Sequence, residues 1–98
     1  MDQSKIGALS KRIMGAYEGA LVSGMVYLGD EMGLYRAMHG QGAITSDEVA
    51  KRAGLHERFV REWLSLQAAA GLIAYEGDGL FHLSSEAGLL LAEEDEIR

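Results

Sequence analysis

Apolar residues recur every three or four positions along the first third of the chain, which is the spacing of one face of a long helix. From Ser4 to about Leu28, this stripe consists of Ile6, Leu9, Ile13, Tyr17, Leu21, Gly24 and Leu28. A second apolar row widens it and consists of Met14, Val22, Met25 and Val26. The pattern predicts a long helix whose apolar surface needs cover on more than one side.

Glycines and other small residues also stand in this helix at intervals of four. Such rows let the backbone of another helix approach closely, a rule best established in membranes. Because each glycine costs about 1 kcal/mol of helix stability relative to alanine, we expect a bend or break near Gly19 to Gly24. The apolar run Ile13–Leu28 is short for a membrane span of about 20 residues, and Glu18 interrupts it. Export or membrane insertion is therefore not expected.

The middle of the chain shows well-marked short helices. The segment "MGLYRAMHG" reads as a helix closed by Gly40 and Gly42. In "TSDEVAKRAG" Thr45 can cap a helix and Glu48 would complete a capping box, while Gly54 suits the left-handed residue that ends it. After Leu55, which should enter the core, "HERFVREWLSLQAAAG" reads as a second helix that ends at Gly71 in the same way.

The last third predicts a β-hairpin and a further helix. "LIAYE" and "LFHLS" are joined by Gly77-Asp78-Gly79, a hairpin turn signal. "SSEAGLLL" starts a helix with Ser84 or Ser85 as its cap. The expected fold is mainly α: a winged helix-turn-helix with a long N-terminal helical extension and a small β-hairpin wing. We expect a helical arm over residues 1–31, a winged-helix body over 32–91, and an acidic tail or linker over 92–98.

The charge distribution argues against DNA binding. The net charge of −6 comes entirely from residues 72–98, which hold seven acids against Arg98 alone. DNA affinity requires Lys and Arg against phosphates, whereas the wing tip here carries Glu76 and Asp78. Two ion pairs are expected in the second helix, because Glu57 and Arg61 stand four residues apart, as do Arg58 and Glu62. Each arginine would then have an acidic neighbour. A DNA-binding regulator remains the alternative interpretation, since Arg58 and Arg61 could still reach guanine edges.

No catalytic or metal site is expected in this chain. "GQGAIT" and "GDGLFH" lack the third glycine of a dinucleotide loop and read as turns. The absence of cysteine excludes disulfides and thiolate ligands and is compatible with the cytoplasm. His39, His56 and His82 are isolated in sequence, so no metal-ligand pair arises. The run Glu93-Glu94-Asp95-Glu96 reads as a solvated acidic tail rather than a cation site.

Taken in order, "GLYRAM", "ITSDEVAKRAGLHERFVREWL" and "AAAGLIAYEGDGLFHLSSEAGLLL" resemble the N-terminal winged-helix domain of class I S-adenosylmethionine-dependent methyltransferases, and the small-molecule and O-methyltransferase-like branches most of all. The resemblance implies a module that dimerises and helps to wall a substrate pocket. It implies a homodimer, a small-molecule substrate, and S-adenosylmethionine bound by a following Rossmann domain. The chain stops before any strand and Gly-x-Gly loop of that domain, so neither catalytic nor cofactor residues are assigned here.

Two sets of residues are candidate interaction surfaces. A long apolar helix cannot be covered by a small winged-helix body, and large exposed apolar patches mark interaction sites. We expect the apolar stripe to face a second copy or another domain, through Ile6, Leu9, Ile13, Tyr17 and Leu21. The alternative is that this helix folds back onto its own domain. Phe59 and Trp63 form a further apolar row and are either core residues or an exposed docking surface.

Overall fold

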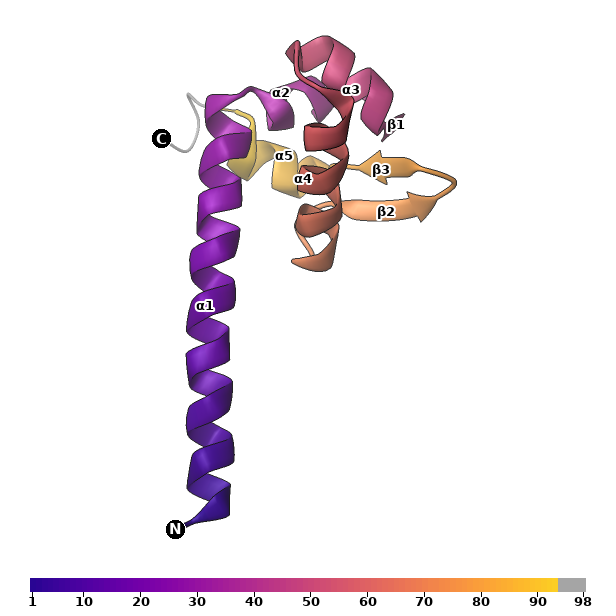
Figure 1. The fold of residues 1–98 in the computed structure, drawn as a ribbon. Helices are drawn as coiled ribbons and strands as arrows, with labels where there is room; N and C mark the ends of the chain where they lie inside the picture. The colour runs from indigo at the N-terminus through magenta and orange to yellow at the C-terminus, as the bar shows by residue number, and fades with distance from the viewer. Residues whose placement is uncertain (94–98) are drawn as a thin grey trace.

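The computed structural model describes residues 1–93 and places a small winged body at one end of a long helix (Figure 1). The elements in chain order are α1 (Gln3–Glu31), α2 (Leu34–Met38), β1 (Ala43–Thr45), α3 (Ser46–Ala53), α4 (Glu57–Ala69), β2 (Ala74–Gly77), β3 (Leu80–His82) and α5 (Ser85–Leu91). This is the expected mainly α fold with a small sheet and a long N-terminal helix.

Helix α1 runs without interruption from Gln3 to Glu31, so the break predicted near Gly19 to Gly24 is wrong. Glycine lowers helix propensity but keeps its backbone N–H, so the hydrogen-bond ladder continues through it, which proline would prevent. At the first turn the carboxylate of Asp2 accepts from the backbone N–H of Ser4 and Lys5. The Ser4 hydroxyl donates to the same carboxylate, and these bonds lower the pKa of Asp2. The helix ends before Gly33, whose φ of 73° lies in the left-handed region.

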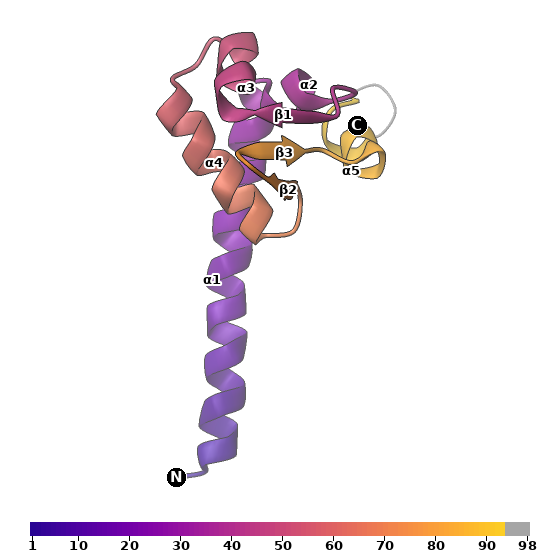
Figure 2. The ribbon, with the colours of Figure 1, turned by 90° about the vertical axis from the view of Figure 1, so that its right-hand side faces the viewer.

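Most of α1 stands away from the body (Figure 2). Every residue from Met1 to Leu21 is exposed, and the side chains that pack on the core begin at Met25 and Val26. The molecule is consequently elongated, with extents of 54 × 32 × 21 Å. The alternative that this helix folds back onto its own domain is therefore wrong. We call residues 3–21 the arm.

The helix-turn-helix forms as its sequence signals predict. The Thr45 hydroxyl accepts from the backbone N–H of Glu48 at 3.2 Å and caps α3. Gly54 closes that helix with a φ of 70°, which a residue with a side chain adopts only under strain. The core between the two helices contains Val49, Val60 and Leu64, all fully buried. Leu55 and Ala53 pack against it from the turn.

The wing is part of a three-stranded antiparallel sheet with the strand order β1-β3-β2. Strand β1 was not predicted, because three residues that end at the cap of α3 are too few to show an alternating pattern in the sequence. It pairs with β3 so that the buried Ile44 and Phe81 lie opposite each other. All three residues of the predicted hairpin turn, Gly77, Asp78 and Gly79, have positive φ.

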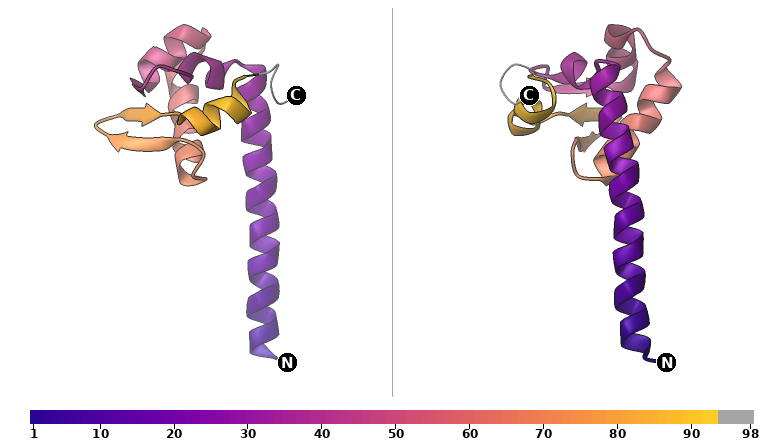
Figure 3. Two further views of the ribbon diagram at one scale, coloured as in Figure 1. Left: turned by 180° about the vertical axis from the view of Figure 1, so that it is seen from behind. Right: turned by 90° about the vertical axis from the view of Figure 1, so that its left-hand side faces the viewer.

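The chain returns to the body through α5 (Figure 3). Ser84, one of the two predicted caps, accepts from the N–H of Ala87 at 3.1 Å. Ala92 is buried and Glu93 lies beside His39, with 2.8 Å between Glu93 Oε2 and His39 Nε2. The packed body therefore reaches Glu93, although a tail was expected from residue 92. The remaining tail residues, 94–98, lie outside the described part of the chain.

Candidate interaction surface

The apolar stripe of the arm is open to solvent along its whole length. The exposed fractions are 43% for Ile6, 56% for Leu9, 48% for Ile13, 70% for Tyr17 and 52% for Leu21. Met14, on the edge of the same stripe, is 55% exposed. The charged residues of the arm, Lys5, Arg12 and Lys11 among them, stand on other faces of the helix. The structure thus brings the five predicted interface residues onto one exposed surface.

The junction between α1 and the body is tightly packed. The indole N–H of Trp63 donates to the carbonyl oxygen of Met25 at 2.8 Å, and the ring meets Tyr35 edge to face at 5.0 Å. A Cβ added at Gly29 would lie 2.5 Å from Trp63 and 2.6 Å from Tyr35. Only glycine allows α1 to approach these two rings so closely. Gly29 was missed in the sequence because its partners stand on other helices.

This packing corrects the docking role considered for the aromatic row of α4. Trp63 is 1% exposed and belongs to the core. Phe59 is half-buried and packs against the same cluster. The structure supports the interpretation of this row as core residues rather than as a docking surface, because Met25 of α1 and Tyr35 of α2 pack against Trp63.

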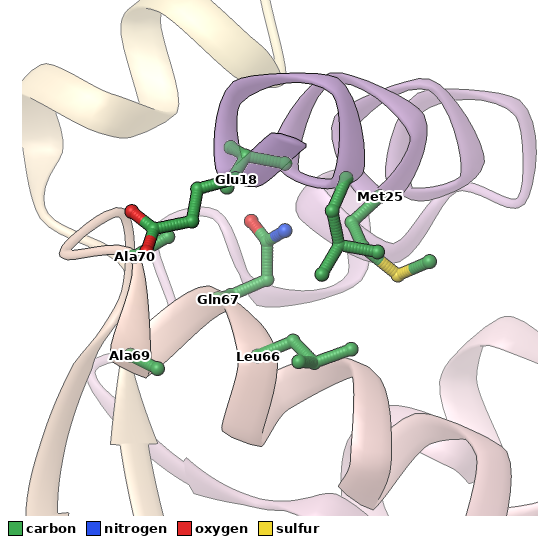
Figure 4. Close-up of a pocket in the computed structure, with 8 residues that line it drawn as sticks. Glu18, Met25, Leu66, Gln67, Ala69 and Ala70 are labelled. Carbon is green, nitrogen blue, oxygen red and sulfur yellow. The ribbon is translucent and has the colours of Figure 1, made fainter. Parts of the chain in front are cut away.

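Beside this junction lies a groove of about 290 Å³ between α1 and the end of α4 (Figure 4). Its lining is mostly apolar and comprises Glu18, Leu21, Val22, Met25, Leu66, Gln67, Ala69 and Ala70. The amide of Gln67 points toward α1 in Figure 4. Gln67 is 1% exposed, and its Oε1 accepts from the hydroxyl of Tyr35 at 2.5 Å. Burial raises the pKa of that Tyr35 hydroxyl to about 12. A polar residue within the apolar row of α4 was the available sequence signal for this pair.

The face of α4 that would enter a DNA groove carries two ion pairs. Arg58 Nε lies 3.5 Å from Glu62 and Arg61 Nε lies 3.6 Å from Glu57, as the spacing predicts. Glu57 also accepts from the Ser46 hydroxyl at 2.5 Å. The wing presents Glu76 near His82, at 3.5 Å. Both arginines have carboxylate neighbours and the wing is acidic, so this face lacks the free positive charge that phosphates require.

The three histidines belong to different elements of the fold. His39 pairs with Glu93, His82 lies by Glu76, and His56 precedes α4, where its side chain makes no capping bond within residues 1–93. Over these same residues there is no group of three or more potential metal ligands. The helices described for this chain include none that is long and apolar enough to cross a membrane.

The chain matches a known domain family and is similar in fold to solved structures. The Rv2258c-like winged HTH domain family matches residues 20–93. The fold of the chain is similar to part of the mitomycin 7-O-methyltransferase MmcR, with a TM-score of 0.80 and 24% identity. The match covers 94% of this chain and 27% of MmcR. No curated protein shows significant similarity to the chain.

Two further methyltransferases share the fold. For the N,N-8-amino-8-demethyl-D-riboflavin dimethyltransferase RosA from Streptomyces davawensis, the TM-score is 0.76 and the identity 18%, over 91% of this chain and 26% of that one. For human N-acetylserotonin methyltransferase, solved in complex with SAM, the TM-score is 0.66 and the identity 18%, over 92% and 26%. The chain thus spans about a quarter of the solved methyltransferase chains that it matches.

Proposed function

The chain belongs to the family of Rv2258c-like winged HTH domains, and from this premise we propose that it is the dimerisation and substrate-chamber module of an S-adenosylmethionine-dependent methyltransferase. Catalysis and cofactor binding reside in a Rossmann domain outside this segment. The three similar folds are those of methyltransferases whose names give small-molecule acceptors, which supports a small-molecule substrate here. A cytoplasmic location, with which a cysteine-free chain is compatible, completes the proposal.

The exposed arm is the observation on which the proposal rests. Five large apolar side chains lie on one face of the arm, and each is at least 43% exposed. Exposure of this apolar surface to water is unfavourable, so its burial against a partner would stabilise the protein. The 19-residue arm also contains Gly7, Gly15 and Gly19, each of which lowers helix stability by about 1 kcal/mol relative to alanine. A second copy of the chain supplies an identical apolar face. Dimerisation therefore covers both arms.

The groove between α1 and α4 is the part of the module that we assign to the substrate chamber. It opens beside the arm and is lined by Leu21, Val22, Met25 and Leu66, with Glu18 at its edge. An apolar cleft with a few polar groups suits a small organic ligand. The catalytic domain would close the open side of this groove.

The mass of the chain in solution tests dimerisation. Size exclusion with light scattering at tens of micromolar should give twice the chain mass. Ile13→Glu, which places a charge within the stripe, should give the single-chain mass, while Lys5→Glu on another face should leave the dimer intact. A wild-type chain that stays monomeric at this concentration contradicts the proposal.

Calorimetric titration with S-adenosylmethionine tests where the cofactor site lies. The isolated chain should give no binding heat, because the proposed cofactor domain is a separate segment. Tight binding of S-adenosylmethionine by these 98 residues would mean that the cofactor site lies in the winged module, which contradicts the proposal.

Titration with random duplex DNA separates this function from that of a regulator. At about 100 mM salt the chain should not shift the duplex, because Arg58 and Arg61 already have carboxylate neighbours. A complex that weakens steeply with added salt would favour the DNA-binding alternative.

A further inference from the structure

We propose that the groove between α1 and α4 binds a compact apolar molecule with a carbonyl oxygen at one end. That oxygen accepts from the side-chain amide of Gln67, and the other end of the molecule presents a hydrogen-bond donor or an ammonium group to Glu18. This inference rests on the proposed substrate chamber and adds the chemical class of its ligand. A buried amide, an apolar wall that is already fixed in place, and a carboxylate at the edge of the groove support it.

The side chain of Gln67 lines the groove although it is only 1% exposed. Its Oε1 accepts from the hydroxyl of Tyr35 at 2.5 Å. Burial raises the pKa of Tyr35 to about 12, so at neutral pH the hydroxyl keeps its proton and remains the donor. With Oε1 held in this way, the Nε2 of Gln67 is turned away from Tyr35, and the amide faces α1 across the groove in Figure 4.

The Nε2 of Gln67 has no acceptor among residues 1–93. Of the described side chains, only His39 has a polar atom, its Nδ1, that lacks both a partner and contact with solvent. The Nε2 of Gln67 therefore keeps an opening, and the space on which this side chain borders is the groove. A donor in apolar surroundings gains most from an acceptor that brings no charge with it, because a buried charge is costly. A carbonyl oxygen meets that requirement.

The rest of the lining selects an apolar body for the ligand. From α1, Leu21, Val22 and Met25 face the groove, and Leu66 faces it from α4. The thioether of a methionine packs favourably against aromatic rings, so an aromatic body suits the side of Met25. The volume of about 290 Å³ is near the lower limit for small-molecule sites, which calls for a compact ligand.

Both walls of the groove are held by contacts outside it. On α1, the carbonyl oxygen of Met25 accepts from the indole N–H of Trp63 at 2.8 Å. Because Gly29 has no side chain, the same helix packs closely against the rings of Trp63 and Tyr35. On α4, the hydrogen bond from Tyr35 holds Gln67. The amide and the apolar wall are in place before a ligand arrives, so binding does not have to order them.

Glu18 gives the groove a direction. It is exposed, and it forms no ion pair with any other residue of the described range 1–93. In Figure 4 its side chain reaches from α1 toward the end of α4. A carboxylate at this position attracts an ammonium or hydroxyl group and repels an anion, more strongly at low salt. A ligand that spans the groove therefore has its acceptor inside and its donor or positive charge outside.

Three aromatic probes of similar size test this ligand class. The compound para-(aminomethyl)acetophenone has a carbonyl at one end and an ammonium group at the other. In para-isopropylbenzylamine an apolar group of similar shape replaces the carbonyl, and in para-acetylbenzoate a carboxylate replaces the ammonium group. The chain should bind the first probe roughly threefold to tenfold more tightly than the second, which cannot accept from Gln67. It should bind the third more weakly than the first.

NMR signals of side-chain amides report where the probes bind. The chain contains three glutamines and no asparagine, so its spectrum has three side-chain NH2 pairs, those of Gln3, Gln41 and Gln67. The first probe should shift the NH2 pair of Gln67 and the methyl signals of Leu21 and Val22, and leave the other two NH2 pairs in place. The isopropyl probe should shift the methyl signals with little effect on the NH2 pair.

Glu18→Gln tests the edge of the groove without removing a buried contact, since the side chain is exposed. It should weaken binding of the first probe about twofold to fivefold, as expected for an exposed ion pair, and should not weaken the carboxylate probe. Glu31→Gln is the matched control, because Glu31 is exposed on the same helix but does not line the groove. The control should leave both affinities unchanged, and equal effects of the two substitutions would contradict the role of Glu18.

The outcomes separate this inference from the proposed function. If the isopropyl or the carboxylate probe binds in the groove as tightly as the first, the ligand class is wrong, although the groove remains a ligand site. If no probe shifts a groove signal at millimolar concentration, the ligand class and the substrate chamber both fail. If the NH2 pair of Gln67 shifts with protein concentration in the absence of a probe, a second copy fills the groove. The inference is then wrong, although dimerisation stands.

Discussion

Helix α1 has two regions with similar composition and opposite surroundings. Its last turns, from Met25 to Gly29, are held by Trp63 and Tyr35, whereas its first five turns, the arm, are exposed at every residue. Both regions are rich in apolar residues and glycine. Apolar content alone therefore does not identify a core. The two regions differ in their packing partners. The last turns of α1 pack against side chains of the body, whereas the chain itself covers no part of the arm's apolar stripe.

Truncation of one aromatic residue in each region should show the largest contrast. Trp63→Ala should lower the free energy of unfolding by about 3 to 5 kcal/mol, because it empties the centre of the core. Tyr17→Ala, a matched change in the arm, should alter it by no more than about 0.5 kcal/mol. Urea unfolding followed by circular dichroism in dilute solution, where arms do not associate, measures both. Equal losses would mean that the arm packs on the body.

Alanine at two glycines of the same helix should give effects of opposite sign. Gly29→Ala should destabilise the fold by about 1 to 3 kcal/mol, since its Cβ would lie 2.5 Å from a Trp63 ring that is fixed by its bond to Met25. Gly15→Ala meets no atom within 4 Å in the described structure and should gain about 1 kcal/mol of helix stability. Thermal unfolding measures the loss in Gly29→Ala. Helix content by circular dichroism in dilute solution measures the gain in Gly15→Ala, because the arm does not contribute to the unfolding of the body. Stabilisation by Gly29→Ala would contradict the close packing.

The buried Tyr35–Gln67 pair should make the stability of the body depend on alkaline pH. The pKa of Tyr35 is raised from 10.0 to about 12 by burial. Because the folded value exceeds the unfolded one, the stabilisation is complete below pH 10 and is lost as the pH rises toward 12. A shift of about two pKa units corresponds to a loss of roughly 2 to 3 kcal/mol. Tyr35→Phe should be less stable at neutral pH, by about 1 to 3 kcal/mol, because Gln67 loses its partner. It should also lack this part of the alkaline decline.

The helix caps provide the smallest contrast. Thr45→Ala should cost the body about 1 kcal/mol, since the N–H of Glu48 loses its acceptor. Asp2→Ala removes the cap of the arm and should fray its first turn without lowering the midpoint of the body's unfolding. Circular dichroism reports the lost helix, and denaturant unfolding reports the stability. A lower midpoint in Asp2→Ala would indicate that arm and body unfold together.

Local signals in the sequence predicted the body well. Thr45, Gly54, Ser84 and the turn at Gly77-Asp78-Gly79 act within a few residues of themselves, so their roles follow from short-range geometry. The ion pairs of α4 were predicted by the same kind of reasoning, from spacing on one helix.

Features that depend on distant partners could not be predicted in this way. The need for Gly29 arises only when Trp63 and Tyr35 arrive from other helices, and the buried Gln67 depends on the Tyr35 hydroxyl. Strand β1 exists because β3 pairs with it. The predicted break in α1 was wrong, because the prediction considered the low helix propensity of glycine but not the backbone hydrogen bonds that continue through it.

Hydrogen exchange at two protein concentrations tests most directly whether the arm is covered by a second copy. Amides of residues 3–21 should exchange slowly at tens of micromolar and rapidly after dilution below the dissociation constant, while those of α4 stay protected at both concentrations. A free helix of this length cannot protect its amides for long. Rapid exchange of the arm at every concentration, or protection that does not change on dilution, would contradict the account.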